Sequence, residues 1–174
     1  MTLHIIVDGY NLIRQSSRLA SFEHRSLESG REALIQWLSN YNRFKSHRIT
    51  VVFDGTQGIG FSNQNRRQGG VHVIFSPPGE SADTVIKRLA AHEREKALVV
   101  TSDRDVAAAA ESHLAATISS QDFEEKLHFV TGIEATKEPA DEELQGWRPT
   151  TKKKGPRKRD PKRVRRNQKR IMEL

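Results

Sequence analysis

Short apolar runs recur along the chain, and each ends abruptly in polar residues. The clearest runs lie at 3–7, 49–53, 71–75 and 97–101, and a weaker one covers 113–118. They are rich in β-branched residues and show little alternation of apolar with polar positions, which is the pattern of strands buried on both faces. The runs therefore predict a mainly parallel sheet of about five strands.

Segments with helical spacing separate these runs. From about Gly30, apolar side chains recur at steps of three and four residues, and a second such segment begins at about Glu80. The segment 106–111 is helical by its alanine content, and 119–127 begins with a serine start signal. Residues 14–28 are polar and give no clear prediction. Strands that alternate with helices indicate an α/β fold with helices on both faces of the sheet.

The C-terminal part of the chain differs from the rest in charge. Thirteen of the 29 Lys and Arg residues, but only two of the 22 acidic residues, lie between Arg148 and Leu174, which gives this part a net charge of +11. Residues 1–147 carry a net charge of −4. We expect one domain at 1–131, followed at 132–174 by a linker and a basic, disordered tail. Such a tail favours a polyanionic partner, most often nucleic acid.

Composition excludes several classes of site. The chain contains no cysteine, so it has no disulfide, no thiolate metal site and no cysteine nucleophile. It has neither G-x-G-x-x-G after the first run nor G-x-x-x-x-G-K-[ST], the phosphate-binding motifs of dinucleotide and P-loop proteins. Because no signal-peptide pattern is visible and no apolar run approaches the roughly 18 residues of a membrane span, we expect a soluble, cytoplasmic protein.

Acidic residues gather where the predicted strands end. Asp8, Asp54 and Asp103 come at or shortly after the ends of three strands, and Glu80 and Asp83 begin the helix after another. Ligands bind at the carboxyl ends of strands in open α/β sheets. Crowded carboxylates repel one another unless a cation lies among them, and their hard oxygens suit Mg²⁺ or Mn²⁺. We therefore expect a divalent-metal site suited to phosphodiester hydrolysis.

Two of these strand ends also fit a purely structural role. Asp8-Gly9 and Asp54-Gly55 are both turn dipeptides. For Asp8 we favour the functional interpretation, because a buried strand runs directly into it, whereas Asp54 stays open between turn and ligand. Asn11 is expected to cap a helix or to orient Asp8 in catalysis, not to bind the metal directly.

The remaining acidic residues lie at expected helix starts, which gives each of them a second interpretation. Glu80 and Asp83 fit the positive end of a helix dipole, and Glu80 stays open between this role and a ligand. Ser102 with Asp105 three residues on fits a capping box, so Asp105 is also open between cap and ligand. Asp83 and Asp103 are favoured as functional.

Basic residues in two segments are candidates for contact with nucleic acid. The loop 56–70 is long for a compact domain, is rich in glycine and contains Arg66 and Arg67. Clusters in the tail can neutralise phosphates whatever the base sequence. They comprise Lys152, Lys153 and Lys154, then Arg157, Lys158 and Arg159, then Lys162, Arg163, Arg165 and Arg166. The histidines show no metal-ligand spacing, so His4 and His72, inside strands, are expected to be structural.

Four motifs in register resemble a known family. Val7-Asp8-Gly9-Tyr10-Asn11, Val51-Val52-Phe53-Asp54, Glu80-Ser81-Ala82-Asp83 and Thr101-Ser102-Asp103 resemble the NYN domains of the PIN-like nuclease superfamily. They are most similar to the bacterial YacP-like branch, which includes a ribosome-associated endoribonuclease. The resemblance covers about residues 3–127, and the basic extension departs from it.

This resemblance carries expectations for fold and function. It implies a three-layer α/β/α, Rossmann-like fold and RNA cleavage that depends on a divalent metal. It maps the acidic site onto Asp8, Asp83 and Asp103, with Asp54 as a fourth member and Asn11 in a supporting catalytic role. The partners that it implies are RNA and translating ribosomes, and the products would carry a 5′-phosphate and a 3′-hydroxyl.

Other protein classes fit the sequence less well. A HAD-type phosphatase needs a second Asp two residues after the first, where Tyr10 stands. A receiver domain needs an acidic pair after the first strand and a lysine after a late strand, and a Toprim domain would have glutamate in place of Asp8. The main alternative is a non-catalytic RNA- or ribosome-binding protein with the same fold. Clustered carboxylates argue against it, because without a metal they repel phosphate.

Overall fold

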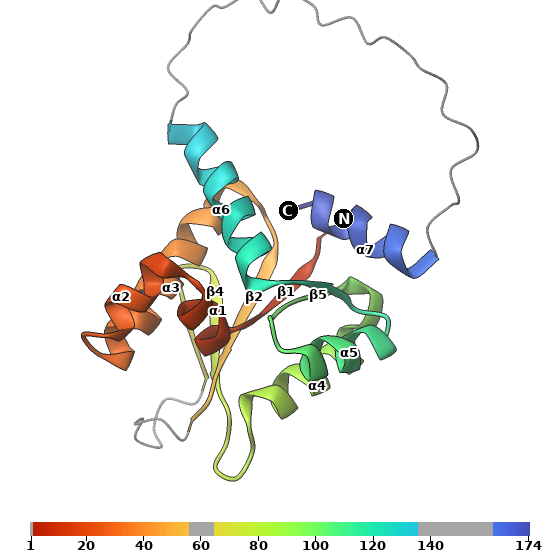
Figure 1. Cartoon of the computed structure of the whole chain (residues 1–174), viewed down its shortest axis with the longest axis horizontal. Coiled ribbons are helices and arrows are strands. Elements are labelled where there is room, and N and C mark those ends of the chain that lie inside the picture. Colours follow the sequence, from red (N-terminus) through yellow and green to blue (C-terminus); the bar gives the residue numbers. More distant parts are fainter. Residues whose placement is uncertain (1, 56–64, 136–161) are drawn as a thin grey trace, which may run out of the picture.

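A six-stranded sheet forms the centre of the fold (Figure 1). The structure is a computed structural model that describes residues 2–55, 65–135 and 162–174. In the sheet order β3-β4-β2-β1-β5-β6, neighbouring strands are parallel except for the antiparallel pair β3–β4. The strands are β1 (His4–Asp8), β2 (Arg48–Phe53), β3 (Asn65–Gln68), β4 (Val71–Phe75), β5 (Ala97–Val100) and β6 (Ala116–Ile118).

The central strands explain the lack of alternation in the apolar runs. Every residue of β1 and β5 is buried, because helices cover both faces of the sheet there. The mainly parallel sheet is thus confirmed. It has one more strand than the five expected, because β3 lies in the segment predicted as a loop. Gly69 and Gly70, with φ of 57° and 82°, form the turn from β3 to β4 in the left-handed region that favours glycine.

Helices on the two faces complete three layers. They are α1 (Gly9–Gln15), α2 (Ser17–Glu23), α3 (Leu27–Phe44), α4 (Ala82–Glu93), α5 (Arg104–Ser112), α6 (Ser120–Ala135) and α7 (Lys162–Met172), with a 3-10 turn at Arg94–Lys96. One core lies under α1, α3 and α6 and includes Leu34 and Phe123. The other lies under α4 and α5 and includes Ile86 and Val106. The α/β/α architecture expected from the resemblance is confirmed.

The polar segment without a clear prediction contains the end of α1, all of α2 and the start of α3. Buried Ser16 separates α1 from α2, because its N–H bonds back to Leu12 and Ile13 while its hydroxyl accepts the N–H of Leu19. Leu19 is the one buried residue of α2. A helix of seven residues with a single buried side chain shows no apolar periodicity, so the sequence did not predict it.

The C-terminal segment contains a helix where we expected disorder. α7 packs along the edge strand β6, and the Asn167 side chain pairs with the Thr117 backbone. Its Oδ1 accepts the Thr117 N–H at 2.7 Å, and its Nδ2 donates to the Thr117 carbonyl at 3.0 Å. Leu174 is 5 % exposed, and its carbonyl accepts a hydrogen bond from the Tyr41 hydroxyl at 3.1 Å. The expectation of a disordered tail is therefore wrong for residues 162–174.

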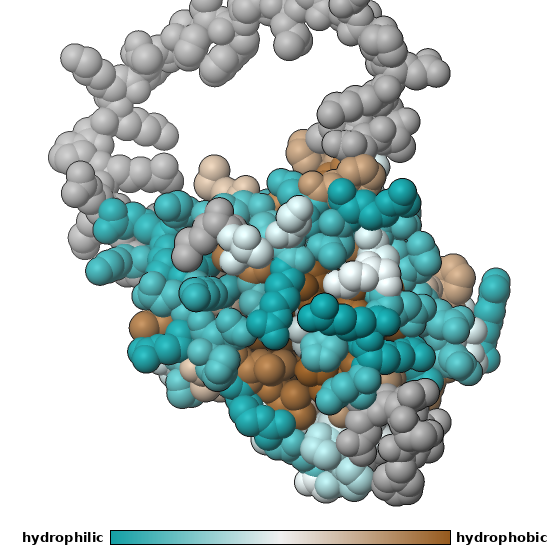
Figure 2. Space-filling model, turned by 180° about the vertical axis from the view of Figure 1, so that it is seen from behind, coloured by the Kyte–Doolittle hydropathy of each residue, from teal (hydrophilic) through white to brown (hydrophobic). Residues whose placement is uncertain are grey.

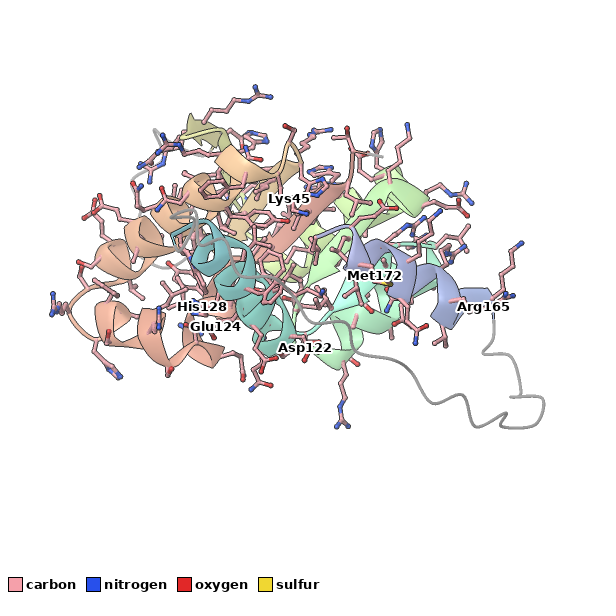
Figure 3. The ribbon with its side chains drawn as sticks, turned by 90° about the horizontal axis from the view of Figure 1, so that it is seen from above. Lys45, Asp122, Glu124, His128, Arg165 and Met172 are labelled. Atoms are coloured by element: carbon pink, nitrogen blue, oxygen red, sulfur yellow. The ribbon has the colours of Figure 1, made fainter. Side chains whose placement is uncertain are left out.

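The physical reason for this error is the strongly one-sided composition of α7. Arg170 and Leu174 are buried, while Lys162, Arg165 and Lys169 are exposed. Figure 3 shows α7 from above, with Arg165 towards its outer end and Met172 at the end nearer α6. Because lysine and arginine are so frequent in this segment, its few apolar residues give no recognisable helical pattern in the sequence. The clusters from Lys152 to Arg159 lie outside the described residues.

The described part of the chain contains no helix that is both long and apolar enough to cross a membrane.

Candidate active site

Asp8 occupies the junction between β1 and α1. It is the last residue of the strand and the N-cap of the helix, and its Oδ1 accepts the Asn11 N–H at 3.3 Å. The Thr101 hydroxyl donates to its Oδ2 at 3.1 Å. Burial, and then the negative charges of Asp83 and Asp103, raise the pKa of Asp8 to about 6, although the two hydrogen bonds oppose the rise. The carboxylate is 7 % exposed and lacks a cationic partner among the described residues.

Asp103 lies three residues after the neighbouring strand β5, directly before α5. It is the N-cap of α5, and its Oδ1 accepts the N–H groups of Asp105 and Val106 at 2.8 and 3.0 Å. Its own N–H donates to the Thr101 hydroxyl at 3.1 Å, so Thr101 connects the two carboxylate residues. The sequence motif contained Thr101, but its spacing alone assigned this residue no role.

Asp83 and Asp54 come to the same edge from two other elements. Asp83 is half-buried in the first turn of α4, whose N-cap is Ser81, and its charge acts on Asp8. Asp54 follows β2, the strand beside β1, and is half-buried. The Gly55 N–H donates to the Ser76 hydroxyl at 2.9 Å, and a Cβ at Gly55 would collide with the Ser76 carbonyl oxygen. Asp54-Gly55 therefore forms a tight connection as well as a candidate ligand position.

Asn11 holds the loop that carries Asp103. Its Oδ1 accepts the Ser102 N–H at 2.9 Å and the Ser120 hydroxyl at 2.7 Å. The contact of Asn11 with Asp8 comes from the backbone N–H and not from the side chain. The side chain thus ties α1 to the β5–α5 loop and to the start of α6, which is a positioning role.

Gly9 and Tyr10 fix the turn out of β1. A Cβ at Gly9 would collide with the Phe53 ring, so this position has no room for a side chain. The Tyr10 and Phe53 rings pack edge to face with centroids 5.1 Å apart, and buried Arg31 donates to the Tyr10 hydroxyl at 2.8 Å. These contacts explain why a glycine and a tyrosine follow the aspartate. No pattern in the sequence pointed to Arg31.

The structure separates Glu80 and Asp105, which the sequence left open: the Glu80 carboxylate is ion-paired, and Asp105 is exposed. The Glu80 carboxylate binds two nitrogens of Arg88. Asp105 is exposed in the first turn of α5, where Asp103 and not Ser102 is the cap. The Ser102 hydroxyl instead accepts the Ser120 N–H at 3.2 Å, so the capping box, one of the two interpretations left open for Asp105, is not formed.

Arg66 and Arg67 point to opposite faces of the sheet from the edge strand β3. Arg66 is paired with Val73, and its buried Nε has no hydrogen-bond partner among the described residues, whereas exposed Arg67 is paired with His72. The two arginines therefore do not form one basic patch.

The carboxylate edge fits a hydrated divalent cation better than a fully protein-ligated one. Among the described residues, no three His, Cys, Asp or Glu side chains stand close enough to enclose a metal ion. Yet Asp8, Asp83 and Asp103 are near enough for their charges to interact, and these hard oxygens are the donors that Mg²⁺ prefers. Mg²⁺ commonly uses one or two carboxylates and keeps several waters.

Known proteins resemble the chain in both sequence and structure. Protein YacP of Bacillus subtilis (strain 168), described as uncharacterized, is 36% identical over 88 residues, which are 49% of this chain and 50% of that protein. The match thus spans about half of that relative. The crystal structure of Rae1 (YacP) from Bacillus subtilis is similar with a TM-score of 0.65 at 28% identity, over 78% of each chain. A mutant of Rae1 in which leucine replaces a tryptophan gives a TM-score of 0.64 at 27% identity, over 76% of this chain and 79% of that one.

The family match extends well beyond the four motifs. The model of the YacP-like NYN domain covers residues 5–172, so it includes α7 and the basic segment that the motifs had left outside the resemblance. With nearly the whole chain matched, and with the acidic edge and fold described above, the protein belongs to the YacP-like NYN domain family.

Proposed function

We propose that this protein is a divalent-metal-dependent endoribonuclease whose active site is the carboxyl end of the sheet. The observation that carries the proposal is Asp8, a buried carboxylate whose pKa is raised to about 6 by burial and by Asp83 and Asp103. Such an arrangement destabilises the empty site and favours a bound cation. The family and the likeness to Rae1 (YacP) support a nuclease-like protein that acts on RNA.

Asp8, Asp83 and Asp103 would hold Mg²⁺ or Mn²⁺, in part through its bound waters, and Asp54 is a further candidate ligand at the next strand. When bound, the cation would lower the pKa of a water molecule and neutralise charge that develops on the phosphoryl group. Such chemistry leaves a 5′-phosphate and a 3′-hydroxyl.

The remaining side chains set the geometry of the site. Thr101 donates to Asp8 and accepts from the Asp103 backbone, so its hydroxyl fixes the separation of the two strand ends. The Asp8 oxygen that accepts from Thr101 is held in one orientation by this bond, and Asn11 anchors the loop with Asp103. These groups pre-organise the carboxylates before substrate arrives.

Basic residues would supply affinity for RNA. We assign this role to exposed Arg67, to the clusters Lys152 to Lys154 and Arg157 to Arg159, and, on the other face of β3, to Arg66. Messenger RNA on the ribosome is the substrate that the family resemblance favours. Because α7 packs on the body, the tail is best tested by changing Lys152–Lys154 and Arg157–Arg159 to glutamine, not by truncation.

Incubation of the purified protein with end-labelled RNA tests the proposal. We expect cleavage with Mg²⁺ or Mn²⁺, none with excess chelator, and none by Asp8→Asn. Products that end in a 2′,3′-cyclic phosphate, or undiminished cleavage in chelator, would contradict it. RNA binding without cleavage under any metal condition would support the alternative, a non-catalytic RNA-binding protein.

A further inference from the structure

The helices on the α4 side leave part of the sheet uncovered. α4 packs across β1, β5 and β2, and α5 packs on α4 and β6. The main helix contact of β4 is with α3, on the opposite face of the sheet. Among the described helices and strands, β3 makes substantial contacts with β4 only. Among the described residues, no helix therefore covers the outer strands β4 and β3 on the α4 side.

The register of the strands identifies the side chains on this surface. Val71, Val73 and Phe75 are buried in the core under α3, so the alternate residues His72 and Ile74 lie on the open side. In the antiparallel pair, Arg67 stands opposite His72 and Asn65 opposite Ile74. We call these four residues, together with Arg48 on β2, the open face.

The open face combines positive charge with flat and apolar groups. Arg48 is 56 % exposed and Arg67 is exposed, and the charges of both act on half-buried His72. Ile74 lies two residues further along β4, where it is half-buried and packs at the border of the core under α4. Figure 2, which views the molecule from behind Figure 1, shows that hydrophobic residues also reach the surface of the domain within a hydrophilic surround. Arg48 pairs with Glu93 at 3.0 Å, whereas Arg67 makes no ion pair within the described ranges. Burial and then the nearby arginines lower the pKa of His72, so its ring is neutral at pH 7.

The open face leads directly to the carboxylate edge. β4 ends at Phe75, and the next residue, Ser76, bonds through its N–H to the Phe53 carbonyl and through its hydroxyl to the Gly55 N–H. This places the end of β4 beside Asp54. A substrate that lies along β4 would therefore reach the acidic residues without leaving the protein surface.

We propose that the open face binds a single-stranded segment of RNA on its way to the carboxylate edge. Arg67 and Arg48 contact phosphates, and His72 and Ile74 contact a base. This inference rests on the proposed function in taking RNA as the polyanion. An acidic site needs cations nearby to hold a phosphate chain, and the arginines supply them.

The dimensions and chemistry of the surface favour a single strand over a duplex. Strands lie about 4.8 Å apart and rise about 3.3 Å per residue, so β3, β4 and the rim of β2 offer a patch roughly 10 Å by 17 Å. A flat ring between two arginines suits an unstacked base, because stacking on aromatic side chains requires bases that are free of a duplex.

Arg67→Gln tests the proposal, with Arg43→Gln as the matched control. Arg43 is an exposed arginine on α3, which packs on the opposite face of the sheet. The measurement is fluorescence anisotropy of a labelled single-stranded RNA of about 12 nucleotides, a length within the range that single-strand sites cover. Chelator is present to prevent cleavage, and binding is measured at several salt concentrations. We expect Arg67→Gln to raise Kd about 3- to 10-fold and to reduce the salt slope by about 0.7, the value of one phosphate contact. Arg43→Gln should behave as wild type.

A second variant tests the role of the Arg67 charge, and a duplex competitor tests the preference for a single strand. Arg67→Glu should weaken binding further while the melting temperature stays that of wild type, and a duplex of the same sequence should compete poorly. Equal effects of Arg67→Gln and Arg43→Gln, or competition by the duplex as strong as by the single strand, would overturn the proposal. Wild-type cleavage with Mg²⁺ is scored separately. Binding through Arg67 without any cleavage would refute only the proposed function, and cleavage with unchanged Arg67→Gln binding would refute only the open face.

Discussion

Each end of the sheet holds a carboxylate with little exposure, but the surroundings of the two carboxylates are opposite in charge. At the amino end, Glu93 Oε1 lies 3.1 Å from His4 Nδ1, 3.0 Å from Arg48 and 3.8 Å from His92. Burial alone would raise the pKa of Glu93, but the hydrogen bond and charge of His4 and the charges of Arg48 and His92 bring it below its usual value. At the carboxyl end, Asp8 receives only neutral donors among the described residues, and its pKa rises to about 6.

This difference in surroundings indicates that Glu93 stabilises the fold, whereas Asp8 is available to bind a ligand. Glu93 has its cations within the protein, and it fixes the start of β1 to the end of α4. Asp8 meets the charges of Asp83 and Asp103 instead, so its ionised form is unfavourable until a cation arrives. A carboxylate that lowers the stability of the fold at neutral pH is typical of a functional site.

Removal of the Asp8 charge should have the largest effect on activity. Asp8→Asn keeps the shape and loses the charge, so we expect cleavage to fall by more than about a hundredfold, since even the loss of a group behind a metal ligand costs about 10- to 100-fold. Single-turnover cleavage with Mg²⁺ measures this. A variant that still folds and cleaves within about threefold of wild type would make Asp8 structural.

The same variant should be more stable than wild type at neutral pH without metal. The pKa of Asp8 is about 6 in the folded state and 3.8 in the unfolded state, so the folded state holds more protons between these values. Stability therefore falls as pH rises from about 4 to about 6, by up to about 3 kcal/mol, and stays lower above that range. Urea unfolding at about pH 4 and about pH 7.5 should show this loss in wild type and not in Asp8→Asn. Parallel pH profiles for the two proteins would contradict it.

The opposite sign is expected at the amino end. Glu93→Gln leaves Arg48 without its counter-charge and replaces the carboxylate partner of the buried His4 ring by a neutral amide, so we expect a loss of about 1–3 kcal/mol at pH 7. The lowered pKa means that the contribution of Glu93 is present above its usual pKa of 4.5 and disappears as pH falls below it. Single-turnover cleavage by the folded protein at saturating RNA should be unchanged, because Glu93 lies at the opposite end of the sheet from Asp8. An increase in stability would remove the contrast between the two ends.

A smaller effect is expected at Asn11. Asn11→Ala removes the acceptor of the Ser102 N–H and the Ser120 hydroxyl, which loosens the loop with Asp103. We expect cleavage to fall about 10-fold, less than for Asp8→Asn, because the carboxylates remain. If the two variants lose equal activity while both stay folded, Asn11 takes part directly in the reaction.

The smallest effect is expected at Glu80. Its carboxylate is already held by Arg88, so Glu80→Gln should cleave within about twofold of wild type and serves as the charge-matched control for Asp8→Asn. A large loss would mean that Glu80 leaves Arg88 to join the site.

The central elements could be predicted from the sequence because burial on two faces leaves a direct mark on composition. β1, β2, β4 and β5 are largely apolar, and the three-layer fold followed from their alternation with helices. β3 has the sequence Asn-Arg-Arg-Gln, which is typical of an exposed edge and carries no such mark. α7 was missed because only its packing against β6 distinguishes it from a solvated basic run.

The acidic edge was predictable for the same reason, but its supporting contacts were not. The position of Asp8 follows from the strand that precedes it. The bridge through Thr101, the acceptor role of Asn11 and the burial of Arg31 depend on residues that lie far apart in the chain, which no local pattern reveals. Metal binding by these carboxylates stays a prediction.

Equilibrium binding of Mn²⁺, followed by the loss of the free-ion signal in electron paramagnetic resonance, tests the central claim most directly. Wild-type protein and Glu80→Gln should bind Mn²⁺ alike at neutral pH, and Mg²⁺ should displace it. Asp8→Asn should bind at least about 10-fold more weakly. Binding by Asp8→Asn as tight as by wild type, or no binding by wild type at millimolar Mn²⁺, would contradict the assignment of the carboxyl end of the sheet as a metal-dependent active site.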